Sequence, residues 1–281
     1  ALPLLVQLIR LMTLKKILVP VDFTRLSDKV IEQASIFSIT ANADLVLFHC
    51  AEKSADVDSV KVKLATKAIN ASKKYNISCN SKVVAGSIFS RIPAEVESGE
   101  YFMVVIGTHG VKGLKQKLLG ADILKLIVKL PVPVLVVQST SPFRHSFDKI
   151  VLPVATHLAY ENILQAVILL AKLFGSEVQI YSIERPGSKV PDQLKKNLQR
   201  SISLFEENDI RYQQINEKQT VASVGFASQT LKYAQKFNAD AIAMMSVSSE
   251  EYHYFAKQDK ENLLTNRNGI PILCASNLEN D

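Results

Sequence analysis

Apolar residues in this chain form short continuous runs, separated by stretches in which they recur every three or four positions. The first run, at 15–21, has Ile17, Leu18 and Val19 at its centre, and the second lies at 45–50. Continuous apolar runs are typical of parallel strands covered on both faces, whereas a spacing of three to four indicates an amphipathic helix. The beginning of the chain therefore predicts a strand, a helix and a second strand.

The same alternation continues along the rest of the chain. Further strands are predicted at 77–84, 102–106, 134–137, 149–154, 177–183, 212–215, 241–245 and 272–274. Helices are predicted at 27–40, 57–75, 120–130, 160–174, 192–208 and 224–237, with a short one within 1–13 and another around Ile92 and Val96, in whose first turn Pro93 is expected. Strands alternating with helices predict an α/β fold with doubly wound, Rossmann-like parallel sheets.

The second half of the chain repeats the first. The run at 149–154 echoes 16–21 at an offset of 133, and the run at 270–273 echoes 132–135 at an offset of 138. A chain of 281 residues also suits two units of about 140 residues, each large enough for its own core. We therefore predict a duplicated domain.

Two five-stranded sheets related by a pseudo-twofold axis follow from this duplication. The predicted domains are 1–140, in which 1–13 is an N-terminal extension, and 148–281, with a linker at 139–147. The polar strand 77–84 is expected at a sheet edge. The apolar strand 134–137 ends its own sheet and needs a cover, so we predict that it pairs with 272–274 within the same chain.

Composition excludes several classes of protein. The three cysteines, Cys50, Cys79 and Cys274, show no spacing typical of a zinc site or a disulfide framework, which favours a reducing compartment and predicts a cytoplasmic location. No apolar run reaches the 18 or so residues of a membrane-spanning helix, so no membrane partner is expected.

Charge is distributed unevenly between the halves. Residues 1–140 carry 18 Lys and Arg against 11 Asp and Glu, whereas 141–281 carry 15 against 16. Five lysines lie between 112 and 129, where they could attract a polyanion or simply form a solvated helix face. Because no aromatic residues are interleaved with them, nucleic acid is not an expected partner.

Glycines follow the buried strand 102–106 at Gly107, Gly110 and Gly120. Glycine lets backbone N–H groups approach an anion, and a helix beginning near Gly120 offers further unpaired donors. Asp22 follows the first strand, and in doubly wound sheets ligands bind where the strand order reverses. If the first and fourth strands are neighbours, Asp22 and the glycine loop share one cleft.

The repeat lacks this chemistry. Ala155 stands where the first half has Asp22, and we align Ser246 and Ser249 with Gly107 and Gly110. Acidic residues at 250, 251, 259 and 261 would repel a phosphate group. The second half is therefore interpreted as a structural partner.

These motifs resemble the universal stress protein family, in a tandem arrangement of two domains. The resemblance rests on Lys16 to Phe23, on the G-x2-G-x9-G spacing at Gly107, Gly110 and Gly120, and on Pro133 to Val137. It implies the strand order 3-2-1-4-5 in each sheet and ATP binding in the glycine-bearing branch. It further implies that two chains can associate as a homodimer.

The resemblance also assigns the site. It implies that Pro20, Val21 and Asp22 line the adenine and ribose pocket, that Cys50 and Ile106 flank the base, and that Gly107, Gly110, Gly120 and Ala121 surround the phosphates. One departure concerns the residues after the third glycine, where the family usually has hydroxyl side chains. Here they are Ala121 and Ile123, so each lost contact should weaken binding by about 1.5 to 3 kcal/mol.

No catalytic constellation accompanies this site. We expect His49 to be a hydrogen-bonded core residue, His109 a solvated turn residue, Cys50 a small buried hydrophobe, and Ser87 and Ser90 helix caps. The predicted function is regulatory binding of ATP or another adenine nucleotide, with Mg²⁺ as an accompanying ion and at most slow incidental hydrolysis. The alternative is an interaction scaffold that has lost its nucleotide site.

Overall fold

The computed structural model describes residues 15–53, 56–108, 120–158, 160–187, 189–220, 226–246 and 257–276. The helix predicted within 1–13 and the glycine loop from His109 to Leu119 lie outside these ranges. In the first half the elements are β1 (Lys16–Pro20), α2 (Arg25–Ala41), β2 (Asp44–Ala51), α3 (Val57–Tyr75), β3 (Cys79–Ala85), α4 (Ile88–Ser98), β4 (Tyr101–Thr108), α5 (Gly120–Ile127) and β5 (Val134–Gln138).

The second half has the same succession of strands and helices. Its elements are β6 (Lys149–Pro153), α6 (Glu161–Phe174), β7 (Glu177–Glu184), α7 (Asp192–Glu207), β8 (Arg211–Lys218), α8 (Ala227–Phe237), β9 (Ala241–Met245), α9 (Lys257–Leu264) and β10 (Ile272–Ala275). The predicted elements within the described ranges are therefore present. The helix predicted at 120–130 is shorter, ending at Ile127, and the strand predicted at 212–215 extends to 211–218.

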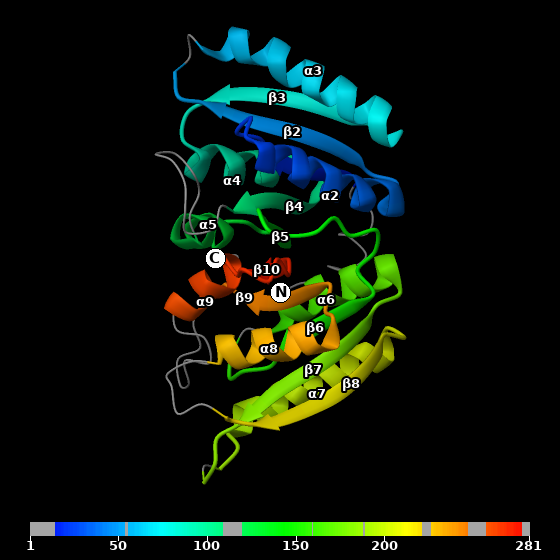
Figure 1. The fold of residues 1–281 in the computed structure, drawn as a ribbon, viewed down its shortest axis with the longest axis vertical. Coiled ribbons are helices and arrows are strands. Elements are labelled where there is room, and N and C mark those ends of the chain that lie inside the picture. Colours follow the sequence, from blue (N-terminus) through cyan, green and yellow to red (C-terminus); the bar gives the residue numbers. More distant parts are fainter. Residues whose placement is uncertain are drawn as a thin grey trace.

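All ten strands belong to one sheet with the order β3-β2-β1-β4-β5-β10-β9-β6-β7-β8 (Figure 1). Each half has the predicted order 3-2-1-4-5, and β3 lies at the predicted edge. The repeat also extends to the register, since Ile17 pairs with Met103 in the first half and Ile150 with Ala241 in the second. These pairs are related by the same offsets that relate the sequence motifs.

Two apolar layers cover the two faces of the sheet. One contains residues of α2, α3, α6 and α7, and the other contains residues of α4, α5, α8 and α9. Successive residues of β1 alternate between them, with Ile17 and Val19 in the first layer and Leu18 in the second. Because each layer includes helices from both halves, the core is continuous across the molecule.

The two halves meet at β5 and β10, which pair antiparallel at the centre of the sheet (Figure 1). Leu135 lies opposite Leu273, and both side chains are almost completely buried. The predicted intrachain pairing is thus confirmed. The antiparallel direction of this single pair, with the same strand order on both sides, agrees with the predicted pseudo-twofold relation.

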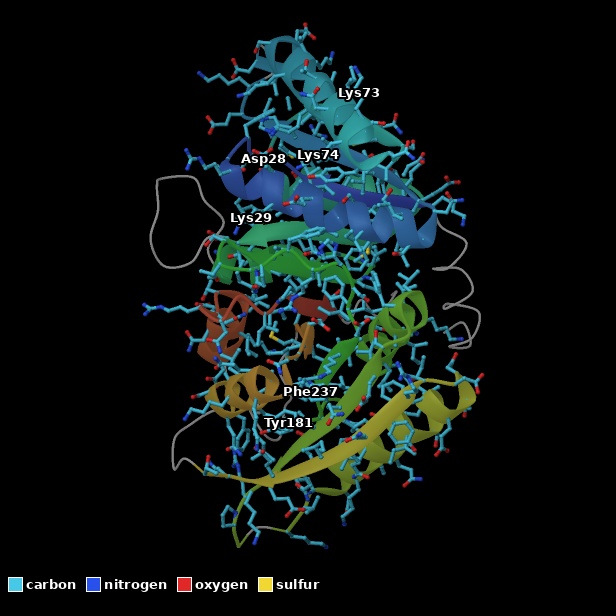
Figure 2. The ribbon with its side chains drawn as sticks, turned by 45° about the vertical axis from the view of Figure 1, so that its right-hand side comes forward. Asp28, Lys29, Lys73, Lys74, Tyr181 and Phe237 are labelled. Atoms are coloured by element: carbon cyan, nitrogen blue, oxygen red, sulfur yellow. The ribbon has the colours of Figure 1, made fainter. Side chains whose placement is uncertain are left out.

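The linker between β5 and β6 is held by both halves. Lys29 on α2 donates to the carbonyl of Ser139 at 2.7 Å (Figure 2), and Gln33 exchanges two hydrogen bonds of 2.9 Å with the backbone of Arg144. The guanidinium of Arg144 in turn forms an ion pair with Asp240 of the second half. Rigid-body freedom between the halves is therefore small.

Pro93 lies deeper in α4 than the sequence predicted. The helix begins at Ile88, so Pro93 is in its second turn rather than its first. Proline has no N–H, and the carbonyl of Phe89 consequently loses its helical donor. The ammonium of Lys129 lies 3.5 Å from that carbonyl and replaces part of the lost interaction.

Leu135→Pro should destabilise the protein as a whole. Proline removes a donor from the strand between β4 and β10 and leaves a buried acceptor unpaired, which should reduce the free energy of unfolding by about 1–3 kcal/mol beyond any lost packing. Urea unfolding followed by circular dichroism measures the effect, and Leu135→Ala, which keeps the N–H, is the matched control for lost packing. An unchanged midpoint for the proline variant would contradict the structural role of this pair.

Candidate functional site

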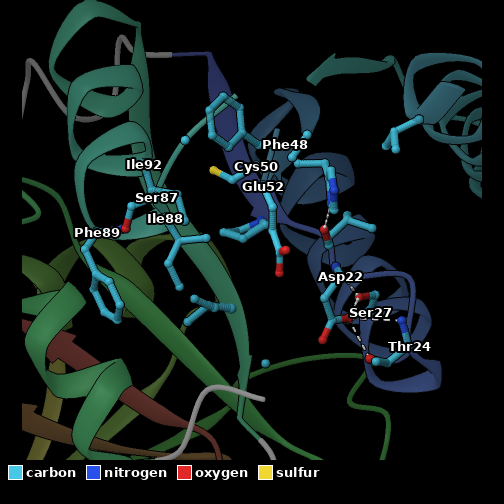
Figure 3. Close-up of a pocket in the computed structure, with 18 of the residues that line it drawn as sticks. Asp22, Thr24, Ser27, Phe48, Cys50, Glu52, Ser87, Ile88, Phe89 and Ile92 are labelled. Atoms are coloured by element: carbon cyan, nitrogen blue, oxygen red, sulfur yellow. Dashed lines mark hydrogen bonds between the residues drawn. The ribbon is translucent and has the colours of Figure 1, made fainter. Parts of the chain in front are cut away.

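A cavity of about 970 Å³ opens at the carboxyl ends of β1, β2 and β4. The chain leaves β1 toward α2 and β4 toward α5, and these helices pack in different apolar layers. The cavity therefore lies where the strand order reverses, which is the place where doubly wound sheets bind ligands. Residues of α3 and α4 complete its walls (Figure 3).

Six of the nine predicted site residues line this cavity: Pro20, Val21, Asp22, Cys50, Ile106 and Gly107. Gly110 lies outside the described residues. Gly120 and Ala121 are the first two residues of α5, and the next residue, Asp122, lines the cavity. The structure thus brings the ends of three strands and the beginning of α5 to one site.

Asp22 has a structural role as well as a place in the cavity wall. Its Oδ1 accepts from the backbone N–H of Thr24 at 3.0 Å and from the hydroxyls of Thr24 and Ser27 at 2.6 and 2.5 Å (Figure 3). The hydroxyl of Ser27 accepts in return from the backbone N–H of Asp22. Asp22 therefore stabilises the turn before α2 and also lines the cavity.

The loop after β1 is fixed by contacts on several sides. Phe23 has a φ of 60°, a conformation uncommon for a residue with a side chain. Its ring lies 4.9 Å from the ring of His49 and beneath the ammonium of Lys63. His49 Nδ1 donates to the carbonyl of Val21 at 2.7 Å, so the predicted hydrogen bond is present, but the ring is half-buried and lines the cavity rather than lying in the core. The cavity wall at Val21 and Asp22 is thus preorganised.

Gly107 is required by packing. A Cβ at this position would lie 2.7 Å from Cγ of Leu26 and 2.9 Å from Cγ2 of Val30. These distances are shorter than van der Waals contact, and both side chains belong to α2, which covers β4. The absence of a side chain at Gly107 therefore permits the close approach of α2, whether or not a ligand is bound.

Cys50 and the serines of α4 behave as structural residues. Burial raises the pKa of the Cys50 thiol to about 11, so the thiol stays protonated at neutral pH and is a poor nucleophile. Ser87 is the N-cap of α4, where its Oγ accepts from the N–H of Phe89 at 3.3 Å, as predicted. Ser90 lies inside α4 and donates to the carbonyl of Ser87, so the prediction that it caps the helix was wrong.

Three carboxylates in the cavity wall were missed by the sequence reasoning. Glu52, Asp56 and Asp122 join Asp22 there, while the described lining contains no Lys or Arg. Glu52 and Asp56 follow β2 in a segment whose sequence is typical of a solvated turn, so nothing in the sequence marks them as cavity residues. Asp122 could have been predicted as a cavity residue, because it lies two positions after the third glycine. No cluster of three or more metal-ligating side chains occurs among the described residues.

The corresponding place in the second half holds a cavity of only about 50 Å³. Three residues differ between the two places. Ala155 replaces Asp22, Phe226 precedes α8 where Ser87 precedes α4, and Met245 is the counterpart of Gly107. The alignment of Gly107 with Ser246 was wrong by one position, because Gly107 pairs with Val137 and Met245 with the equivalent Ala275.

Comparison with known proteins agrees with this architecture. Residues 13–138 match the universal stress protein family. This part of the chain is therefore a universal stress protein domain. No curated protein matches the chain.

Solved structures resemble the chain over both halves. A universal stress protein from Archaeoglobus fulgidus DSM 4304 has a TM-score of 0.70 at 18% identity, with 94% of this chain and 99% of that chain covered. A functionally unknown protein from Pseudomonas aeruginosa PAO1 has a TM-score of 0.63 at 17% identity, covering 95% and 94%. At these identities the likeness establishes the fold.

The same fold extends beyond the family. The cytoplasmic domain of a prokaryotic cation chloride cotransporter has a TM-score of 0.50 at 11% identity, with 95% of this chain and 97% of that chain covered. Because one fold occurs in proteins of different function, the function must be argued from the site rather than from the fold.

In the part of this chain that the structure describes, no helix has the length and apolar character needed to cross a membrane.

Gly107→Ala should reduce the free energy of unfolding by about 1–3 kcal/mol, since the added methyl group overpacks the contact with α2. A double-mutant cycle with Leu26→Ala, measured by urea unfolding, tests the cause. Leu26→Ala removes the colliding side chain, so Gly107→Ala should cost less in that background. If the cost is the same in both backgrounds, close packing against Leu26 is not the reason for the glycine.

Proposed function

We propose that the first half of this chain binds an adenine nucleotide and that the protein acts as a nucleotide-responsive regulator without catalytic activity. The observation that carries the proposal is the large cavity at the switch point, whose walls contain six of the residues expected at such a site. Its volume is within the range of small-molecule and cofactor sites, about 300–1,000 Å³.

The residues of the cavity wall suit the adenine base and the ribose of a nucleotide. Val21, Cys50 and Ile106 present small or apolar groups from the ends of β1, β2 and β4, which suit a flat aromatic ring. Asp22 lies at the same end of β1 and offers a carboxylate, the group that commonly accepts from ribose hydroxyls. Because hydrogen bonds fix the loop at Asp22, little ordering is needed on binding.

The four carboxylates of the wall determine which form of the nucleotide is favoured. Free ATP would bring several negative charges toward Asp22, Glu52, Asp56 and Asp122. Coulomb repulsion between like charges opposes this, and a Mg²⁺ ion held by the phosphates would reduce it. The proposed ligand is therefore the magnesium complex of ATP, and binding should weaken when the metal is chelated.

The side chains that follow the third glycine predict a modest affinity for ATP. Ile123 is completely buried in the apolar layer beneath α5 and has no polar group to offer a phosphate. Ala121 is half-buried at the second position of α5 and likewise lacks a hydroxyl. These two positions therefore offer the phosphates no hydroxyl, which should weaken binding.

Ser87→Phe should strongly weaken nucleotide binding. The substitution places an aromatic side chain at the edge of the cavity, at the position that Phe226 occupies in the second half. Isothermal titration calorimetry with Mg·ATP should show binding to the unchanged protein and at least a tenfold loss of affinity for the variant. Ser98→Phe, on the exposed far end of α4, is the matched control and should bind normally.

The outcome also separates the proposal from its alternative. If the unchanged protein binds neither ATP, ADP nor AMP at millimolar concentration, the nucleotide proposal fails. The interaction scaffold with a lost site is then the better description.

Ala121→Ser should tighten ATP binding by about tenfold, since a hydroxyl at the beginning of α5 can donate a charge-assisted hydrogen bond to phosphate. The matched ligand control is adenosine, which has no phosphate and should bind both proteins equally. An equal gain for adenosine would show that the change does not act through the phosphates.

A further inference from the structure

The helix at the phosphate end of the proposed site lies at the junction between the two halves. α5 begins at Gly120, and Asp122 in its first turn lines the cavity. The helix has eight residues and so spans only about 12 Å. It packs against α4 of its own half and against α9 of the second half (Figure 1). A contact that holds the far end of α5 therefore also determines where its first turn lies relative to the cavity.

The turn that follows α5 takes a hydrogen-bond donor from the second half. The backbone N–H groups of Val128, Lys129 and Leu130 still donate to carbonyls of the helix, but Pro131 has no N–H to continue this pattern. Carbonyls at the end of a helix need donors from elsewhere. The carbonyl of the buried Leu130 accepts from the hydroxyl of Ser276 at 2.7 Å. Ser276 is itself buried and comes directly after β10, so the second half completes the end of this helix.

Ser276 is held in turn by the helix that begins at the second switch point. Asn162, in the first turn of α6, donates from Nδ2 to the backbone carbonyl of Ser276 at 2.7 Å. α6 follows β6 as α2 follows β1, and β6 has the same place in its half of the sheet as β1. A single residue, Ser276, therefore connects α6 of the second half with the turn after α5 of the first half.

The first half makes the reciprocal connection. Gln138 is the counterpart of Ser276, since the preceding residues pair with Gly107 and Met245 in the equivalent register. Its Nε2 donates to the carbonyl of Leu264 at the end of α9, at 3.2 Å. Lys29 on α2 donates to the next carbonyl, that of Ser139, at 2.7 Å. Equivalent positions thus join the halves in both directions through different side chains, which indicates that the connection belongs to the architecture.

We propose that Ser276 is a positioning residue for the nucleotide site, and that through it the second half sets the affinity of the first half for phosphate-bearing ligands. This inference rests on the proposed function, in which α5 lies at the phosphate end of the cavity. Without the hydroxyl, the buried carbonyl of Leu130 loses its donor, and α5 must shift to recover one. The first turn of α5, with Ala121 and Asp122, then moves relative to the loop that hydrogen bonds fix at Asp22. The base pocket at the ends of β1 and β2 stays in place.

Calorimetry on the full chain tests this role with two ligands. Ser276→Ala should weaken Mg·ATP binding about threefold to tenfold, whereas adenosine, which has no phosphate, should bind within about twofold of the unchanged protein. Ser276→Thr keeps the hydroxyl and should restore Mg·ATP binding. Ser201→Ala is the matched control, because Ser201 is a completely buried serine of α7 whose hydroxyl donates to the carbonyl of Asn197. This control should lose stability and bind Mg·ATP normally.

Thermal unfolding of the same variants separates positioning from stability. The inference is overturned if Ser276→Ala lowers Tm but leaves the affinity for Mg·ATP unchanged, or if adenosine loses as much affinity as Mg·ATP. Should Ser276→Ala not fold, Asn162→Ala removes the donor that holds Ser276 and should weaken Mg·ATP binding in the same way. If the unchanged protein does not bind Mg·ATP at all, the proposed function fails and this inference fails with it.

Discussion

The central pair of strands, β5 and β10, is the interaction on which the rest of the molecule depends. A strand at the end of a sheet exposes a row of unpaired backbone groups. Here each half covers that row for the other, with Leu135 opposite Leu273. Because β5 also pairs with β4, the strand that carries Ile106 and Gly107 to the cavity is held from the side by the second half.

The same backbone supports two different sites. Register and strand order are equal in both halves, so the difference between a large cleft and a small cavity comes from a few side chains. Phe226 lines the smaller cavity at the position where Ser87 lines the larger one. A large cavity can thus be reduced to a small one without a change in the arrangement of the strands.

The fold was largely predictable because burial and duplication both constrain it. Runs such as Ile17 to Val19 identify buried strands, and the repeat identifies the pair at the centre. The less predictable features depend on contacts between residues distant in sequence. Pro93 is accommodated with help from Lys129, and Glu52 and Asp56 reach the cavity only through the fold. The sequence alone does not show whether Met245 or Ser246 is the counterpart of Gly107, because only the strand register distinguishes the two alignments.

The packing around Gly107 affects how ligand binding can be inferred from the sequences of similar chains. Its lack of a side chain is demanded by Leu26 and Val30, two residues of the scaffold. Selection for stable folding can then preserve this glycine in a chain that no longer binds a ligand. Gly107 is therefore weak evidence for a bound ligand, although the second half accommodates Met245 at the equivalent position. Nucleotide binding is better judged from positions such as Ala121.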